Sequence, residues 1–179
     1  MAADFRRALA LLHGPENEWN RIVADPSAHR TLRPTQAALL GAATVAALVG
    51  YVFLRPAGTA AFFIPLYAVL FAAGRLLAIF AAERLLRAGG EVLPERAALL
   101  AGWGAMPVLL AGILEILPIP FLRWLWVLAG LGLAYMNLAT AMTPVLGTSS
   151  QRGAKLSLRA SAALALPIVA FDILRTLCP

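Results

Sequence analysis

The sequence predicts an all-α integral membrane protein, a bundle of five transmembrane helices preceded by two short interfacial amphipathic helices. The first observation behind this prediction is composition, because 61% of the 179 residues are hydrophobic and only 13% are charged. Soluble domains average about 45–50% apolar and about 25% charged residues, and a water-soluble fold of this size could not bury so much apolar surface. Cys178 is the only cysteine, which excludes a disulfide scaffold.

The N-terminal segment, residues 1–36, is predicted to form two amphipathic helices on the cytoplasmic membrane interface. The first places four apolar residues on one face: Phe5, Ala8, Leu9 and Leu12. The second begins with Pro15, which suits a first helical position, and ends at Asp25-Pro26. Its apolar residues recur at i, i+3 and i+4: Trp19, Ile22 and Val23. We expect Trp19 and Ile22 to pack against the bundle; the alternative is a mobile tail.

The remaining chain, residues 37–179, contains five apolar segments that predict the transmembrane domain. They cover residues of about 37–54, 60–82, 97–117, 124–146 and 156–177. Each is long enough, as a helix, to cross a hydrocarbon layer of about 30 Å. None shows the wide polar stripe of a helix in a soluble bundle. Four spans contain a proline that predicts a kink: Pro65, Pro107, Pro144 and Pro167.

Positive residues near the span ends predict the orientation. One side carries eleven: Arg6, Arg7, Arg21, Arg30, Arg33, Arg84, Arg87, Arg96, Arg152, Lys155 and Arg159. The other carries three: Arg55, Arg123 and Arg175. Because such residues stay cytoplasmic, the N-terminus is predicted inside and the C-terminus periplasmic, in a bacterial inner membrane given the heavy use of arginine and alanine. This placement accounts for the net charge of +6 and excludes a nucleic acid as partner.

A resemblance supports the same architecture. Residues 14–26 read Gly-Pro-Glu-Asn-Glu-Trp-Asn-Arg-Ile-Val-Ala-Asp-Pro, which resembles the N-terminal segment of bacterial Yip-domain proteins. The likeness extends over nearly the whole chain, through the five spans, and implies that fold, that topology and a non-enzymatic membrane role. Eukaryotic members bind Ypt/Rab GTPases. Their Asp-Leu-Tyr-Gly-Pro and Gly-Tyr-Gly motifs are missing from this sequence, so GTPase binding is not carried over.

The sequence predicts no catalytic, cofactor or metal site. His13 and His29 have no carboxylate or cysteine at a metal-binding spacing. The glycines of 130–132 lack the third glycine of a dinucleotide loop and fall inside an apolar span. The hydroxyls of 148–150 have no histidine or acid nearby to activate them. An enzyme is therefore the least favoured class.

Charged residues inside the spans are informative, because each costs about 2.5–3.5 kcal/mol at the bilayer centre. We expect Arg75 to snorkel toward the cytoplasmic headgroups, apart from the acids Glu115 and Asp172 near the outer surface. Opposite charges should then not meet at the midplane. Asp172 and Arg175, at i and i+3, predict a pair within one helix, to which Glu115, Arg123 or Arg55 could be added as an outer cluster.

Asn137 is the one strongly polar residue near the middle of a span, so its amide is expected to bond to a neighbouring helix. Gly130 and Ala134 form a small-xxx-small pair, as do Ala46 and Gly50, and both pairs suit close helix contacts.

The preferred function is a non-enzymatic adaptor or organiser that binds other integral membrane proteins or membrane lipids. One alternative is an accessory subunit of a larger energy-transducing complex. Another is a small transporter or channel, for which the sequence offers only four polar span residues: Arg75, Glu115, Asn137 and Asp172. A hydrated tunnel past Asn137 that reached both Arg75 and Asp172 would contradict the adaptor interpretation.

Overall fold

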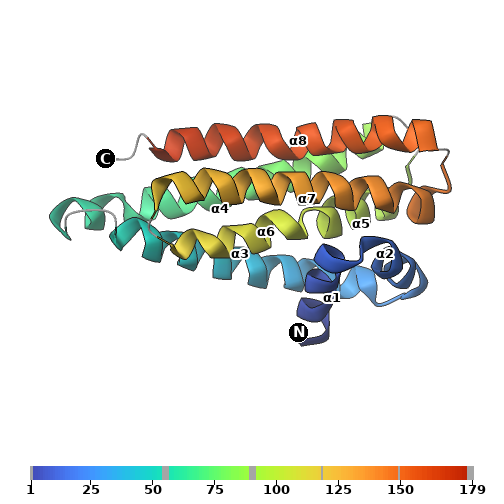
Figure 1. Ribbon diagram of the computed structural model, residues 1–179, viewed down its shortest axis with the longest axis horizontal. Helices are drawn as coiled ribbons and strands as arrows, with labels where there is room; N and C mark the ends of the chain where they lie inside the picture. Colours follow the sequence, from blue (N-terminus) through green and yellow to red (C-terminus); the bar gives the residue numbers. More distant parts are fainter. Residues whose placement is uncertain (1, 54–56, 89–91, 118, 149, 177–179) are drawn as a thin grey trace.

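A computed structural model of the protein describes residues 2–53, 57–88, 92–117, 119–148 and 150–176, and within these ranges every regular element is helical (Figure 1). The elements are α1 Ala2–His13, α2 Pro15–Ala24, α3 Ala28–Phe53, α4 Ala57–Ala88, α5 Pro94–Gly104, α6 Met106–Ile113, the short 3-10 helix η1 Leu114–Ile116, α7 Pro120–Leu146 and α8 Ser150–Thr176. Arg55, Ser149 and Cys178 lie outside the described residues.

Five stretches are long and apolar enough to cross a membrane, which confirms the predicted fold class. They are Ala28–Phe53, Phe63–Ala88, Pro94–Ile116, Phe121–Leu146 and Gln151–Thr176. The outer surface of the bundle exposes large apolar side chains, among them Val69, Leu128 and Leu166, as a lipid-facing surface does. The architecture is that of a multi-pass membrane protein.

The helices extend beyond the apolar segments that the sequence marks. The third helix begins at Ala28 rather than near residue 37, and α4 continues to Ala88 rather than ending near residue 82. Hydropathy marks only the part of a helix that suits hydrocarbon, whereas the backbone hydrogen bonds continue through polar residues with good helix propensity. Because the helices are longer than the apolar segments, a charged side chain can lie farther from the end of its helix than the hydropathy indicates.

The third span is the centre of the bundle. In its most apolar stretch 72% of the residues are buried, against 28–39% in the other four. It is divided at Ala105, just before Pro107, into α5 and α6, and it ends in η1. A break therefore lies beside one of the four predicted kink prolines, and the other three lie inside continuous helices: Pro65, Pro144 and Pro167.

The N-terminal segment packs against one end of the bundle, which we call the N-terminal end (Figure 1). Trp19 and Ile22 are fully buried, as predicted. The Trp19 indole Nε1 donates to the backbone oxygen of Asn137 at 3.0 Å and to its side-chain Oδ1 at 2.7 Å. The segment is thus joined to α7 by side-chain hydrogen bonds as well as by apolar contact.

The predicted apolar faces of these two short helices are partly wrong. Val23 is 48% exposed, and Phe5 and Leu9 are also exposed. Among the side chains of α1 that the structure describes, those of Ala8 and Leu11 are buried. Each helix meets the bundle through a face rotated from the one that apolar residues alone select, because specific partners such as Asn137 fix the rotation about the helix axis.

Candidate functional site

Four charged side chains from three spans meet inside the bundle. Arg75 comes from α4, Glu115 from η1, and Asp172 and Arg175 from α8; none is more than 4% exposed. Arg75 Nη2 lies 2.8 Å from Glu115 Oε1, and Arg75 Nη1 lies 3.4 Å from Asp172 Oδ1. Arg175 Nη2 lies 2.8 Å from Glu115 Oε2 and 3.0 Å from Asp172 Oδ1. We call these four residues the charge cluster.

This arrangement confirms the predicted Asp172–Arg175 pair and shows that the prediction for Arg75 was wrong. Arg75 does not snorkel away from the acids but binds both Glu115 and Asp172. Because α4 runs from Ala57 to Ala88, Arg75 lies near the middle of the helix and not close to its end. Opposite charges from separate spans therefore do meet within the bundle.

Glycines allow the helices that carry the charge cluster to approach one another. A Cβ at Gly74 would lie 2.7 Å from the Cβ of Phe171, so α4 and α8 pack with almost no space between them. A Cβ at Gly50 would overlap the carbonyl oxygen of Glu115, so α3 holds η1 through backbone contact. At Gly130 a Cβ would lie 2.8 Å from that of Ala111. The close contacts predicted for Gly50 and Gly130 are thus present, and Ala46 and Ala134 are buried beside them.

Aromatic rings cover the guanidinium groups. The Arg75 Cζ lies 3.4 Å from the ring centroid of Phe71, and the Arg175 Cζ lies 4.8 Å from that of Tyr67 and 4.9 Å from that of Phe71. Sequence reasoning missed these rings. The signal was present, because Tyr67, Phe71 and Arg75 recur every four residues and share one face of α4.

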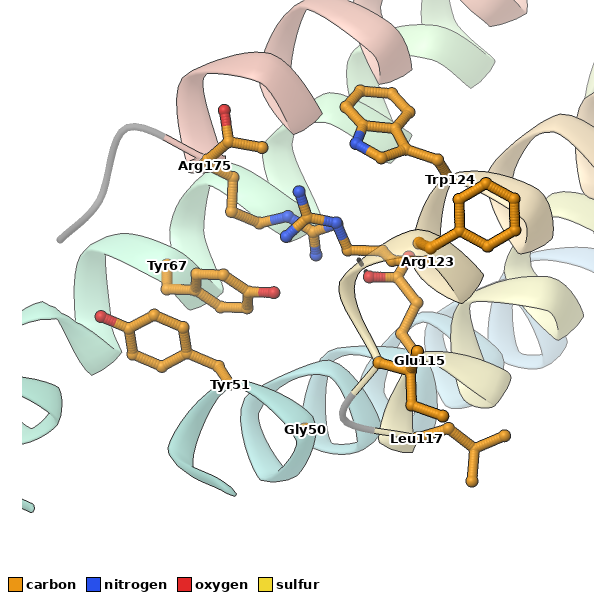
Figure 2. Close-up of a pocket in the computed structure, with 11 residues that line it drawn as sticks. Gly50, Tyr51, Tyr67, Glu115, Leu117, Arg123, Trp124 and Arg175 are labelled. Carbon is orange, nitrogen blue, oxygen red and sulfur yellow. Dashed lines mark hydrogen bonds and ion pairs between the residues drawn. The ribbon is translucent and has the colours of Figure 1, made fainter. Parts of the chain in front are cut away.

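A cavity of about 480 Å³ opens beside Glu115 and Arg175 (Figure 2). It lies at the end of the bundle where α8 ends, opposite the N-terminal segment (Figure 1). Glu115 and Arg175 line it, so the charge cluster forms its floor. Arg123 and Trp124 of α7 and Tyr67 of α4 form its walls, and Figure 2 shows the guanidinium groups of Arg123 and Arg175 directed into its middle. We call this part of the molecule the cavity end.

The space on the other side of the charge cluster, next to Arg75, is closed to water. A void lined by Arg75 and apolar side chains, including Ala105, Val108, Leu164 and Ile168, leaves no space for a water molecule. Among the residues that the structure describes, no three of His, Cys, Asp and Glu gather as a metal site would require. The arrangement can hold an anion or a polar headgroup at one end.

Asn137 lies apart from the charge cluster in the hydrogen-bond network. Its Nδ2 donates to the carbonyl oxygen of Trp103 at 3.2 Å, and its Oδ1 accepts from Trp19. The predicted bond to a neighbouring helix is confirmed. The additional bond to the N-terminal segment was not foreseen, because the sequence does not show which tryptophan comes near.

A groove of about 910 Å³ runs along the outer surface between α3 and α4. Its α3 side contains three small residues, Ala37, Gly41 and Thr44, beside the larger Leu40 and Val45. Arg33 and Glu83 lie at one end, with Arg33 Nη2 3.9 Å from Glu83 Oε2. Sequence reasoning missed this groove, although Ala37 and Gly41 have the same small-xxx-small spacing as the pairs that pack inside the bundle.

Comparison with known proteins gives no match to a family model, to a curated protein or to a solved structure. The resemblance of residues 14–26 to Yip-domain proteins therefore stays a prediction.

Proposed function

We propose that the protein is a non-enzymatic adaptor or organiser of a membrane, which binds another integral membrane protein or lipids. The observation that supports this most directly is the groove between α3 and α4. In a membrane, helices associate chiefly through close packing of small residues and through interhelical hydrogen bonds. A groove lined by such residues on the outer surface is suited to receive a further helix.

Gly41 distinguishes the groove from the interior contacts. A Cβ at Gly50, Gly74 or Gly130 would collide with a neighbouring helix, whereas no described atom lies within 4 Å of one placed at Gly41. The close packing that this glycine permits is therefore not used within the chain. We propose that a transmembrane helix of a partner uses it.

The polar end of the groove indicates what kind of helix fits. The Arg33 side chain is 76% exposed, and its contact with Glu83 is long, at 3.9 Å. Glu83 also pairs with Arg87. An acidic residue at the end of the partner helix would complement Arg33, and such a pair at a wet helix end is worth up to about 1 kcal/mol. Such a pair would determine the register of the partner helix in the groove more than the affinity of binding.

Filling the groove tests the proposal. Gly41→Leu should abolish binding of the partner, because it occupies the groove without an internal clash. Gly132→Leu is the matched control, since the space around Gly132 is equally open on α7. A photoreactive residue at Val45 in the groove, compared with one at Leu128 on α7, reports the contact in intact membranes. We expect the photoreactive residue at position 45 to form adducts with the partner. Gly41→Leu should remove these adducts, and Gly132→Leu should retain them.

Two results would overturn this proposal. Identical adducts from positions 45 and 128 would mean that the groove selects nothing. If the adducts formed only with a second copy of this chain, and if the purified protein alone formed them too, the protein would be self-associating and not an adaptor. A stoichiometric partner that resists detergent would favour the accessory-subunit version of the same role.

The Yip-domain resemblance supports this role, and so does the predicted topology, with the N-terminal end in the cytoplasm of a bacterium. A small transporter is the second candidate. The observation that favours it is the charge cluster, because opposite charges from three spans face one another beneath an open cavity. The apolar layer below Arg75 argues against it, and measurable solute flux in proteoliposomes that Asp172→Asn removes would place it first.

A further inference from the structure

The cavity carries one positive charge in excess. Two guanidinium groups, those of Arg123 and Arg175, and one carboxylate, that of Glu115, line it. The charges of Arg75 and Asp172, which pair beside it, balance each other. Both oxygens of Glu115 are already bound by arginines. The carboxylates thus leave one cation without a counterion, on the side that faces the cavity.

Hydrogen-bond donors of this region also lack acceptors. Arg175 is 1% exposed, yet its Nε and Nη1 have no partner among the described residues. The Nε of Arg123 is likewise buried without one in the part of the chain that the structure describes. A buried donor without an acceptor is unfavourable, and two guanidinium groups directed into one space suit an anion with several oxygen atoms.

The surroundings indicate that this anion belongs to an amphiphile. The walls include the stacked rings of Tyr51 and Tyr67, whose centroids are 4.2 Å apart, and Trp124. At the rim, Ile119 and Phe121 are 49% and 76% exposed, so apolar surface leads from the cavity outward. Aromatic residues of this kind are typical of the zone where lipid headgroups lie. A volume of about 480 Å³ suits a headgroup but not a whole lipid.

We propose that the cavity binds the phosphodiester headgroup of a singly charged anionic phospholipid through Arg123 and Arg175, with the acyl chains outside over the apolar rim. This inference deepens the lipid-binding part of the proposed function and rests on it. It does not depend on the groove. The cavity then acts as a lipid receptor at one end of the bundle.

Native mass spectrometry of the purified protein with added phosphatidylglycerol or phosphatidylcholine tests the inference. Both lipids carry a phosphodiester, but only the first has a net negative charge. We expect one phosphatidylglycerol to be retained in about tenfold preference, which corresponds to one charge-assisted contact. Equal retention of the two lipids would overturn the proposal.

A matched pair of variants locates the binding. Arg123→Gln removes a cavity charge but leaves the charge cluster intact, so the fold is preserved and the preference should fall about tenfold. Arg159→Gln removes an exposed charge from the far part of α8 and should leave the preference unchanged. Equal loss in both variants would show diffuse surface attraction and overturn the site. Arg175→Gln is less informative, because it also disrupts the charge cluster.

Two competitors identify the source of the anion. Displacement of the lipid by millimolar inorganic phosphate would overturn the lipid assignment in favour of a free anion. Stronger retention of oleate would overturn the phosphodiester assignment in favour of a carboxylate. Absence of bound phosphatidylglycerol, with adducts at position 45 still formed, would refute this inference alone. Loss of those adducts with the lipid still bound would refute only the groove.

Discussion

The two ends of the bundle bury polar groups in opposite ways. At the N-terminal end, Asn137 is a neutral amide that two tryptophans satisfy, Trp19 through its indole and Trp103 through its carbonyl oxygen. At the cavity end, four charged side chains are buried together, and several of their donors have no acceptor among the described residues. The buried Nε1 of Trp103 also lacks a partner among the described residues, but at the cavity end such donors belong to arginines that line an open cavity.

The difference teaches how a buried polar group relates to its function. A neutral amide whose hydrogen bonds are satisfied holds two helices together and needs no further ligand. A set of buried charges is stable only while each has its partner, and an excess donor beside open space is a site for a ligand. Neither polarity nor an unpaired donor alone separates the two cases; the difference is the open cavity beside the donors of Arg123 and Arg175.

The first prediction decides which end faces which compartment, and its expected effect is all or none. A periplasm-active reporter, such as alkaline phosphatase, should be active when fused after Arg55, Arg123 or Pro179, because the cavity end carries few positive residues. It should be silent after Gly90 or Ser150. Activity at Gly90 would reverse the ends and place the cavity in the cytoplasm.

The second prediction concerns the charge cluster. Glu115→Gln should lower the free energy of unfolding by about 3–5 kcal/mol, because it removes one of the two carboxylates that Arg75 and Arg175 share and leaves a buried cation uncompensated. Chemical unfolding in detergent measures this loss. Glu95→Gln, at an exposed position, should change it by less than about 0.5 kcal/mol. Similar values for both variants would mean that the buried charges contribute nothing specific.

The third prediction concerns the N-terminal end. Trp19→Phe should cost about 1–3 kcal/mol, since it removes the donor and leaves the Oδ1 of buried Asn137 without its partner. Trp126→Phe is the control, because the Trp126 Nε1 already lacks a partner within the described residues and only ring contacts are lost. Thermal unfolding followed by circular dichroism compares the two. Equal losses would show that the hydrogen bond does not fasten the segment.

The fourth prediction has the smallest effect and concerns Asp25, which follows α2 outside the spans. Hydrogen bonds from Ser27 and then from Arg7 lower the pKa of Asp25 from 3.8 to about 2. A lowered pKa means that the folded state favours the carboxylate, so this stabilisation is present above pH 3.8 and is lost as the pH falls toward 2. Carboxyl NMR titration should show the pKa rise in Ser27→Ala. An unchanged pKa in that variant would contradict the assigned cause.

How much the sequence foretold differs between the two ends. The five spans, the break before Pro15 and the burial of Trp19 follow from apolar runs and proline chemistry, which act locally. The charge cluster did not follow, because the depth of Arg75 depends on where α4 ends, and hydropathy places that end too early. Helix rotation was also out of reach, as the exposed Val23 shows.

The charge cluster has a consequence for the synthesis of the protein. Arg75 is separated from Glu115 by 40 residues and from Asp172 by 97 residues along the chain. At about 5–20 residues per second, α8 emerges roughly 5–20 s after Arg75 has been made. During that interval α4 contains a cation whose second acid does not yet exist.

An unpaired arginine in hydrocarbon is unfavourable by about 2.5–3.5 kcal/mol. The nascent α4 is therefore expected to stay beside the insertion machinery, or near the headgroups, until the third span brings Glu115 to Arg75. The last two members of the charge cluster, Asp172 and Arg175, then arrive together on α8 as one acid and one base, so the cluster is close to electrically neutral before and after its completion.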